Sequence, residues 1–472
     1  MTLQPSIQDR RGFFRRTGFS LGSAALGSLL NQSSASAANP THSSQGNFPA
    51  RAKSVIYLHM IGAPSQLDLF DPKSELVVHN NEVCPESFLT GRRFAFIGGE
   101  MRLAGSRQKF SQHGESGHSI SGLLPHLSTV SDELCIVHSL HTDEINHAPA
   151  QIFLHTGFGR GGRPSFGSWV TYGLGSENQD LPAYVVLQSG TVGGAGSSMY
   201  SSGFLPSVHQ GVPFRSEGES VLYLSNPEGH SSDSRRRVLD AVGSLNEVRL
   251  ADVGDPEIAT RISQYEMAYR MQTSVPELMD INDESAETLE LYGAKPGKGS
   301  FANNCLLARR LVERGVRIIE LYDSDWDHHN NLDSRLANKC KDIDQAAAAL
   351  ITDLKRRDML NDTLVIWGSE FGRTPLAQGA DGNGNKTTGG RDHHKDAFTF
   401  WLAGGGIRGG VSYGKTDEFG FSVTEQPVHV HDLNATVLHL LGLDHERLTF
   451  KYQGREFRLT DIGGNIMTDC LV

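Results

Sequence analysis

The feature that most constrains the fold is an alternation of helical and β-rich segments in the last third of the chain. Residues 301–315 carry apolar side chains at helical spacing and end in a glycine, and residues 316–322 follow as a β-rich run. The pattern repeats, with a helix predicted over 333–357 and a strand over 363–367. This alternation with short connections predicts an α/β fold, with a mostly parallel central sheet covered by helices on both faces.

Other segments extend this pattern toward the N-terminus and beyond residue 367. A helix is predicted near 123–130, and Asp432 is predicted to cap a helix that runs to Leu441. Residues 189–235 are rich in Gly and Ser, and 236–295 are mainly helical, so we interpret 189–295 as an insertion or cap over the sheet. Further strands are predicted at 54–60, 133–138, 184–187 and 397–402. We therefore predict one α/β domain over residues 48–472.

Composition excludes several classes of protein. The 472 residues are enough to bury a large core, and the only long apolar run is near the N-terminus, which excludes a polytopic membrane protein. The net charge is −11 and no Lys/Arg stripe interrupts the body of the chain, so no nucleic-acid partner is expected. The five cysteines are widely spaced and odd in number, which fits buried thiols better than a disulfide scaffold or a zinc Cys pair.

The first 38 residues have the pattern of a targeting segment. Arg10-Arg11 is followed by Phe13-Phe14, by an apolar run from Gly18 to Leu30, and by the small residues Ala35-Ser36-Ala37-Ala38. The apolar run is too short to span a bilayer as a stable helix. The segment resembles a twin-arginine export signal. The resemblance implies the twin-arginine export machinery as a partner, an exported protein in the periplasm or at the cell surface, and no integral membrane span.

Four polar clusters lie at the ends of predicted strands, where open parallel sheets bind their ligands. Asp325, Asp327 and His329 follow the strand at 316–322, and an extended chain would place all three on one side. Carboxylates and imidazoles that converge are ordinary ligands of divalent metals. The other clusters are Ser65–Asp71 with Asp68, Gly368–Arg373 with Glu370, and Arg391–Lys395 with His393 and His394.

Longer motifs carry a resemblance to known proteins. Residues 125–157, from Pro125-His126-Leu127 through Asn146-His147 to Thr156-Gly157, resemble the early part of sulfatases. From about 50 to 465 the chain resembles a bacterial family of exported proteins of unknown function, abundant in planctomycetes and grouped in the alkaline phosphatase and sulfatase superfamily. The motifs that carry this second resemblance are Gly62–Asp68, Trp326–His329, Ser369–Pro375 and Asp432–Leu438.

The resemblance implies an alkaline phosphatase/sulfatase-like sandwich with a metal site at the carboxyl edge of the sheet. Phosphatases of the superfamily use two zinc ions, and sulfatases use one calcium ion beside a formylglycine. Carried over by position, Asp327 and His329 match metal ligands, and Glu370 stands at the Asp of the Ser-Asp-His-Gly motif. His393 or His394 matches a late ligand histidine, and Asp68 is a displaced substitute for a first-strand aspartate. The ligands expected for one divalent metal ion, zinc or calcium, are Asp68, Asp327, His329, Glu370 and His393.

Departures from the superfamily pattern leave the reaction open. His147 stands at the position of the nucleophile, with Ala150 and Gln151 where a Ser and an Arg follow, so neither a formylglycine nor a serine nucleophile is available there. Phe371 replaces a metal-binding histidine. His147 can act as a nucleophile, a general base, a metal ligand or a structural histidine. Arg373 can bind an anion or form a salt bridge between loops.

Two functions follow from these residues and the resemblance. The first is an exported metal-dependent hydrolase of phosphate or sulfate esters, acting on a small-molecule or glycan ester, with His147 and Arg373 as catalytic residues. The alternative is a non-catalytic exported binding or assembly protein that keeps the superfamily fold. The missing nucleophile favours the second function, and the retained acidic and imidazole groups favour the first.

Overall fold

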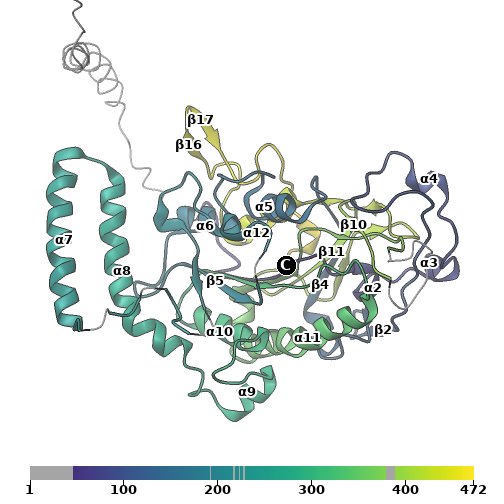
Figure 1. Ribbon diagram of the computed structural model, residues 1–472, viewed down its shortest axis with the longest axis horizontal. Helices are drawn as coiled ribbons and strands as arrows, with labels where there is room; N and C mark the ends of the chain where they lie inside the picture. The colour runs from purple at the N-terminus through teal and green to yellow at the C-terminus, as the bar shows by residue number, and fades with distance from the viewer. Residues whose placement is uncertain (1–45, 192, 216–217, 223, 227–228, 379–388) are drawn as a thin grey trace, which may run out of the picture. The chain divides into compact units, whose positions relative to one another are not determined.

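A nine-stranded sheet lies at the centre of the computed structural model (Figure 1), in the order β12-β4-β11-β8-β1-β7-β5-β6, with β15 also paired to β4. The structure describes residues 46–472 apart from 192, 216–217, 223, 227–228 and 379–388, so the predicted export signal at 1–38 lies outside the described residues. The strands are β1 (Ser54–Met60), β4 (Leu134–His141), β5 (Tyr184–Ser189), β6 (Val212–Phe214), β7 (Ile318–Asp323), β8 (Thr363–Gly368), β11 (Phe398–Ala403), β12 (Val411–Tyr413) and β15 (Val428–His429).

Most neighbouring strands of this sheet are parallel. β1 pairs in parallel with β7 and β8, and β5 pairs in parallel with β6 and β7. β11 is the exception, because it runs antiparallel to both β4 and β8. Every residue of β1, β7, β8 and β11 is buried, which explains their nearly continuous apolar sequences. The predicted mostly parallel α/β sheet is confirmed.

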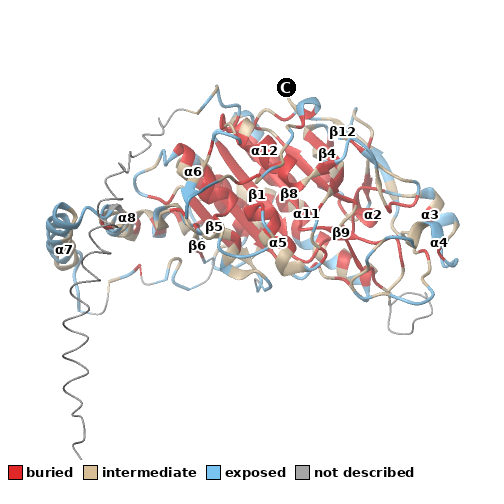
Figure 2. Cartoon of the chain, turned by 90° about the horizontal axis from the view of Figure 1, so that it is seen from above, coloured by how far each residue is buried: buried red, intermediate tan, exposed pale blue. Residues whose placement is uncertain are grey.

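Helices cover both faces of the sheet, as predicted (Figure 1). One apolar cluster joins the sheet to α10 (Phe301–Glu313) and α11 (Leu332–Arg356). A second cluster, on the other face, includes α5 (His147–Thr156), α6 (Phe166–Leu174) and α12 (Val430–Leu440). Figure 2, a view from above through these layers, shows the strands of the sheet as buried. The predicted spacing on α11 is confirmed, since its buried side chains recur every three or four residues.

Two local predictions are wrong. The helix predicted near 123–130 is only a 3-10 helix over Leu127–Glu133. α12 begins at Val430 and its N-cap is His429, whereas Asp432 is the third helical residue. Oδ2 of Asp432 accepts a hydrogen bond from the backbone N–H of His429 at 2.8 Å. Asp432 therefore completes a capping box and is not the N-cap residue.

The segment 189–295 is only partly separate from the sheet, because β6 is its edge strand. α7 (Ser232–Val253) and α8 (Pro256–Met279) form a helical hairpin, and α7 has no buried residue (Figures 1 and 2). Among the described residues, no helix has both the length and the apolar character needed to cross a membrane. All five cysteines are buried and free.

Short elements complete the described chain. β9 and β10 form a two-stranded antiparallel pair that matters for the site, because Arg373 lies opposite His393 in it. The short elements are α2 (Gln66–Leu69), α3 (Ser74–Val78), α4 (Glu86–Leu89), α9 (Ala286–Tyr292), β2 (Phe110–His113), β3 (His118–Ser121), β9 (Gly372–Arg373), β10 (His393–His394), β13 (Lys415–Thr416), β14 (Val423–Glu425), β16 (Phe450–Tyr452) and β17 (Arg455–Phe457).

Candidate metal centre

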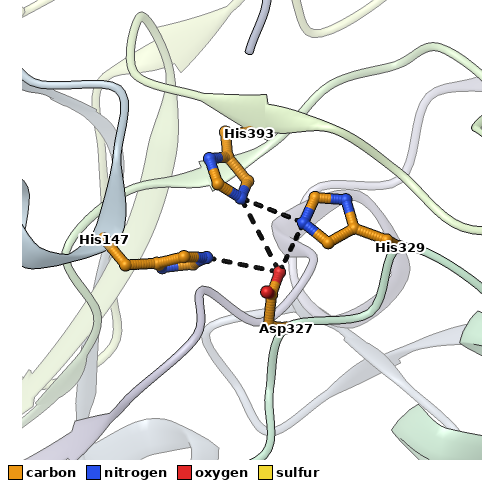
Figure 3. A group of neighbouring side chains, drawn as sticks. All are labelled: His147, Asp327, His329 and His393. Atoms are coloured by element: carbon orange, nitrogen blue, oxygen red, sulfur yellow. Dashed lines mark hydrogen bonds and ion pairs between the residues drawn. The ribbon is translucent and has the colours of Figure 1, made fainter. Parts of the chain in front are cut away.

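Four side chains from distant parts of the sequence meet in one group (Figure 3). They are His147, Asp327, His329 and His393, and one ligand atom of each lies within 4.8 Å of every other. We call this set the His3Asp group. His147 is the first residue of α5, Asp327 and His329 follow β7, and His393 belongs to β10. The structure therefore brings together four of the seven site residues predicted from the sequence.

Backbone contacts at the sheet edge place Asp327. The side chain of Trp326 is fully buried, and its Nε1 donates to Oδ2 of Asp323, the last residue of β7, at 2.8 Å. The Trp326 N–H donates to the carbonyl of Ile61, just after β1, at 3.2 Å. Gly62 has φ of +112°, and a Cβ there would lie 2.5 Å from the Asp327 nitrogen. Only glycine fits at position 62, which explains the close approach of the two loops.

The ligand atoms have spacings that suit a single small cation. An Oδ1 atom of Asp327 lies 3.2 Å from Nε2 of His147, 2.8 Å from Nε2 of His329 and 3.7 Å from Nε2 of His393. The Nε2 atoms of His329 and His393 are 3.1 Å apart. Four ligands about 2.0–2.1 Å from a tetrahedral zinc ion would be about 3.4 Å from one another. Four of the six separations lie near this value and the two between His147 and the other histidines are within 4.8 Å, so a small movement of His147 would bring all four donors to a zinc ion.

Each imidazole of the His3Asp group has an acceptor on its other nitrogen. Nδ1 of His147 is 2.6 Å from Oε1 of Glu370, and Nδ1 of His329 is 2.6 Å from Oε1 of Gln378. Nδ1 of His393 is 2.8 Å from the carbonyl oxygen of Ile145. An acceptor at Nδ1 holds the proton there, so the lone pair of each ring is on Nε2 and faces the other ligand atoms. Metal-binding histidines in proteins are held in this way.

Glu370 lies behind His147 and outside the His3Asp group. Its fully buried carboxylate accepts hydrogen bonds from His147 Nδ1, from Gln151 Nε2 at 3.0 Å, from the Gly62 N–H at 3.1 Å and from Ser369 Oγ at 2.5 Å. Burial raises the pKa of Glu370, but the hydrogen bond and charge of His147 outweigh burial and hold that pKa far below its usual range. Glu370 was predicted to bind the metal, and this geometry instead makes it the partner that orients His147.

Arg373 donates only to groups of the protein. Its guanidinium is fully buried and donates to Oδ1 of Asp327 at 2.6 Å and to the carbonyl oxygens of Ala63 at 2.8 Å, Arg391 at 3.1 Å and Gly62. Of the two roles considered for Arg373, the geometry corresponds to the salt bridge between loops. These contacts use four of the five N–H groups of the guanidinium.

Asp68 is separated from the His3Asp group, in contrast to the expectation from the sequence. Its carboxylate is 2% exposed and accepts from Arg391 Nε at 2.8 Å and from Ser65 Oγ at 2.5 Å. Burial raises the pKa of Asp68, but the charge and hydrogen bond of Arg391 lower it below 3.8 overall. Both carboxylate oxygens are occupied by these donors, because Arg391 Nη2 also lies 3.3 Å from Oδ1.

Two neighbouring residues also lie outside the His3Asp group. The prediction that Asp325 shares a side with Asp327 and His329 is wrong, because the backbone at Asp325 turns with φ of +73°. The Asp325 carboxylate instead pairs with Arg335 Nη2 at 2.6 Å. His394 is buried next to His393, and burial lowers its pKa to about 4. Of the alternatives His393 and His394, the structure places His393 in the group.

Sequence reasoning missed the outer partners of the histidines. Gln378 and the Ile145 carbonyl have no motif that marks them, since any residue can supply a backbone oxygen. Phe96 was missed as well, and its ring lies edge-on 5.2 Å from the rings of both His329 and His393. Phe96 is 64% exposed, and this exposure is known only from the structure, so no signal in the sequence marked it.

The electrostatics of the group reflect mutual hydrogen bonding. Burial lowers the pKa of His147, but hydrogen bonds with Asp327 and Glu370 raise it to about 9 overall. Burial lowers the pKa of His393 despite its contact with Asp327. Burial raises the pKa of Asp327, and the hydrogen bonds of the three histidines together with the charge of Arg373 hold it far below its usual range. Asp327 is therefore the shared acceptor of the group, and a divalent cation that binds there would displace the imidazole protons, because histidine ligands are neutral.

Fold and site together define an α/β protein with a candidate metal centre at the carboxyl edge of a mostly parallel sheet. The chain belongs to a family described as proteins of unknown function (DUF1501), which matches residues 52–471. No curated protein matches the sequence.

Several solved structures share similarity with the chain. A sulfatase from Pseudoalteromonas sp. is 13% identical with a TM-score of 0.38, and the match covers 89% of this chain and 72% of that chain. Alkaline phosphatase from the Antarctic bacterium TAB5 is 10% identical with a TM-score of 0.31, over 75% of this chain and 92% of that chain. A phosphonate monoester hydrolase from Silicibacter pomeroyi is 9% identical with a TM-score of 0.32, and the match covers 82% of this chain and 73% of that chain.

Proposed function

We propose that the protein is a metal-dependent hydrolase of phosphate or sulfate esters. The observation that carries this proposal is the convergence of three Nε2 atoms and Oδ1 of Asp327, with an acceptor on every Nδ1. A divalent cation held by these four atoms would act as a Lewis acid toward an ester oxygen and would lower the pKa of a bound water. Three nitrogens and one carboxylate oxygen are ligands that suit zinc, whereas calcium prefers oxygen ligands alone, so we propose zinc.

Four protein ligands would fill a tetrahedral shell, so a water or an ester oxygen would have to enter as a fifth ligand from the exposed side of the group. The side chain of Asp327 is 42% exposed, and those of His147 and His329 are 22% and 24% exposed. Solvent therefore reaches the His3Asp group, whereas the supporting carboxylate of Glu370 is fully buried. Among the roles considered for His147, we propose metal ligand, because Glu370 fixes its Nδ1 and its Nε2 faces Asp327.

The first test is metal content followed by turnover. The full-length protein is purified, its metals are measured by mass spectrometry, and it is assayed with an aryl phosphate and an aryl sulfate. We expect bound zinc and turnover of one of the two esters, both lost in His329→Ala. Asp325→Asn is the matched control, because Asp325 lies on the same loop but pairs with Arg335 outside the group. Turnover that persists in metal-free His329→Ala would contradict the proposal.

A non-catalytic binding or assembly role is the alternative. It is favoured by the sequence at the position of the superfamily nucleophile, where His147 stands and Ala150 and Gln151 follow, so that neither a serine nor a formylglycine precursor is available there. Stoichiometric zinc with no turnover of either ester would support this alternative.

We also propose that the protein is exported through the twin-arginine pathway, on the sequence of residues 1–38 alone. Fractionation of cells that express the full chain tests this location. We expect Arg10→Lys/Arg11→Lys to retain the protein in the cytoplasm, and unchanged export of this variant would contradict the proposal.

A further inference from the structure

A cavity of about 900 Å³ lies beside the candidate metal centre, at the carboxyl ends of β5 and β7. Its walls include Ser189 at the end of β5, Asp323 at the end of β7, Ala302 in the first turn of α10 and Ala346 on α11. None of the four residues of the His3Asp group lines it. The cavity is therefore a separate space at the edge of the sheet that binds ligands in parallel α/β folds.

Lysines enter the cavity wall from two sides. Lys295 and Lys298 belong to the loop before α10, and Lys339 and Lys341 belong to α11. Among the described residues, no carboxylate forms an ion pair with Lys295, Lys298 or Lys341. In a chain with a net charge of −11, this concentration of unpaired cations is a local exception.

The acidic residues of the wall offset these charges only in part. Asp323 is paired with Lys339 at 2.6 Å, and Asp325 is paired with Arg335 at 2.6 Å. Asp342 is the third carboxylate, and Arg215 is a fifth cation on the wall. The lining therefore keeps an excess of positive charge, which favours an anionic ligand.

The lysine loop is held in place by one side chain. Asn303 is 5% exposed, and its Oδ1 accepts from the Lys295 N–H at 2.8 Å. Its Nδ2 donates to the carbonyls of Lys295 at 2.8 Å and Lys298 at 2.6 Å. This clamp fixes the loop against the start of α10, so the site is ordered before a ligand binds and less entropy is lost on binding.

The start of α10 adds to the positive potential. Ser300 Oγ accepts from the Asn303 N–H at 3.1 Å, while Phe301 and Ala302, which line the cavity, begin the 13-residue helix. Backbone N–H groups in a first turn have no partner within the helix, and they favour an anion.

A buried acceptor next to the same wall has no partner. Asn304 is 1% exposed, and its Nδ2 donates to Ser189 Oγ at 2.7 Å and to the Gln188 carbonyl at 3.1 Å, both from lining residues. Its Oδ1 has no hydrogen-bond partner among the described residues. Buried acceptors are normally satisfied, and this one suits a hydroxyl or a water at the wall, because an anionic oxygen has no proton to donate.

We propose that this cavity is an anion-binding subsite for a ligand that carries two or more phosphate or sulfate groups. Asp325 on its wall and Asp327 in the His3Asp group are two residues apart, so their Cα atoms are at most about 7 Å apart. One anionic group of an oligoanionic ester occupies the cavity while another reaches the metal centre. The part of this inference that concerns a substrate rests on the proposed function, and the binding of a polyanion does not.

The test is calorimetric titration of the full-length protein with sucrose octasulfate and, in a second arm, with inositol hexakisphosphate. The variants are Lys298→Gln/Lys341→Gln and the control Lys355→Gln/Lys451→Gln, which removes two exposed lysines elsewhere. We expect one polyanion to bind, at least about tenfold weaker binding in the cavity variant, and unchanged binding in the control. The affinity falls as salt rises, because the lysines are exposed.

Asp327→Asn separates failure of this proposal from failure of the proposed function. If the cavity binds the polyanion, Asp327→Asn still binds it, and adding Lys298→Gln/Lys341→Gln to Asp327→Asn weakens this binding at least about tenfold, whatever happens to hydrolysis. Loss of binding in Asp327→Asn but not in the cavity variant would place the anion at the metal centre and overturn the subsite. Equal losses in the cavity and control variants, or no binding of either polyanion, would overturn it as well.

Discussion

Asp68 and Asp327 are both carboxylates at the carboxyl edge of the sheet, and each is paired with a buried arginine. Asp68 is 2% exposed, and its oxygens are taken by Arg391 and Ser65. Asp327 has a side chain that is 42% exposed and faces three imidazole nitrogens. The difference shows that position after a strand does not decide the role of a carboxylate. Its role depends on which groups face the part of the carboxylate that the arginine does not contact.

The largest effect is expected for Asp327→Asn. This change removes the negative charge at the point where three nitrogens converge, so the purified protein should lose its zinc, from about one ion per chain to almost none. Metal analysis and hydrolysis of the preferred ester are measured together. Full zinc occupancy in Asp327→Asn would contradict the proposal that Asp327, unlike Asp68, is a metal ligand.

Asp68→Asn should act on stability and leave the metal in place. It leaves the guanidinium of Arg391 buried without its counter-charge, which costs about 3–5 kcal/mol of the free energy of unfolding. Denaturant unfolding measures the loss, and metal analysis of the folded fraction supplies the comparison. Loss of zinc from folded Asp68→Asn would return Asp68 to the ligand set predicted from the sequence.

Glu370→Gln tests the support of His147. The amide keeps the size of the carboxylate but accepts the His147 Nδ1–H more weakly, so zinc affinity should fall about 10- to 100-fold. Competition with a chelator measures this affinity. An affinity below that of Asp327→Asn would show that Glu370 is itself a ligand.

The Asp68 pair also predicts a pH dependence. The pKa of Asp68 is lower in the folded state than its ordinary value of 3.8, so the unfolded state binds the proton first. The contribution of Asp68 to stability is therefore complete above pH 3.8 and is lost as the pH falls through the lower folded pKa. The difference in unfolding free energy between wild type and Asp68→Asn should be constant at about pH 5–7 and should narrow below that range. A difference in unfolding free energy that grows as the pH falls would contradict a lowered pKa of Asp68 in the folded state.

The smallest effect is expected for Asp325→Asn, which breaks an exposed ion pair with Arg335. The free energy of unfolding should change by less than about 1 kcal/mol, and zinc content should stay the same. Thermal unfolding and metal analysis check both statements. A loss of zinc would restore the predicted cluster of Asp325, Asp327 and His329.

The fold could be predicted further than the site. The fully buried strands β1, β7 and β8 have apolar sequences that mark them, and the spacing of Leu336, Cys340 and Ile343 marks α11. These patterns are local, so the chain itself displays them. The antiparallel direction of β11 depends on its neighbours and left no sign in its sequence.

The site depends on contacts between distant segments. Residue type and strand ends drew attention to Asp327, His329 and His393, and the structure brings these side chains together in one group. These patterns could not show that Arg391 would pair with Asp68, because the two are 323 residues apart. Nor could they show that Glu370 would contact the outer nitrogen of His147, 223 residues away. Backbone acceptors such as the Ile145 carbonyl have no residue-type signal at all.

A crystal structure of the zinc-loaded protein, with data collected on both sides of the zinc absorption edge, would locate the metal. We predict one anomalous peak about 2.0–2.1 Å from Nε2 of His147, His329 and His393 and from an oxygen of Asp327. A peak coordinated by Asp68 or Glu370, or no peak within reach of the three Nε2 atoms, would contradict this prediction.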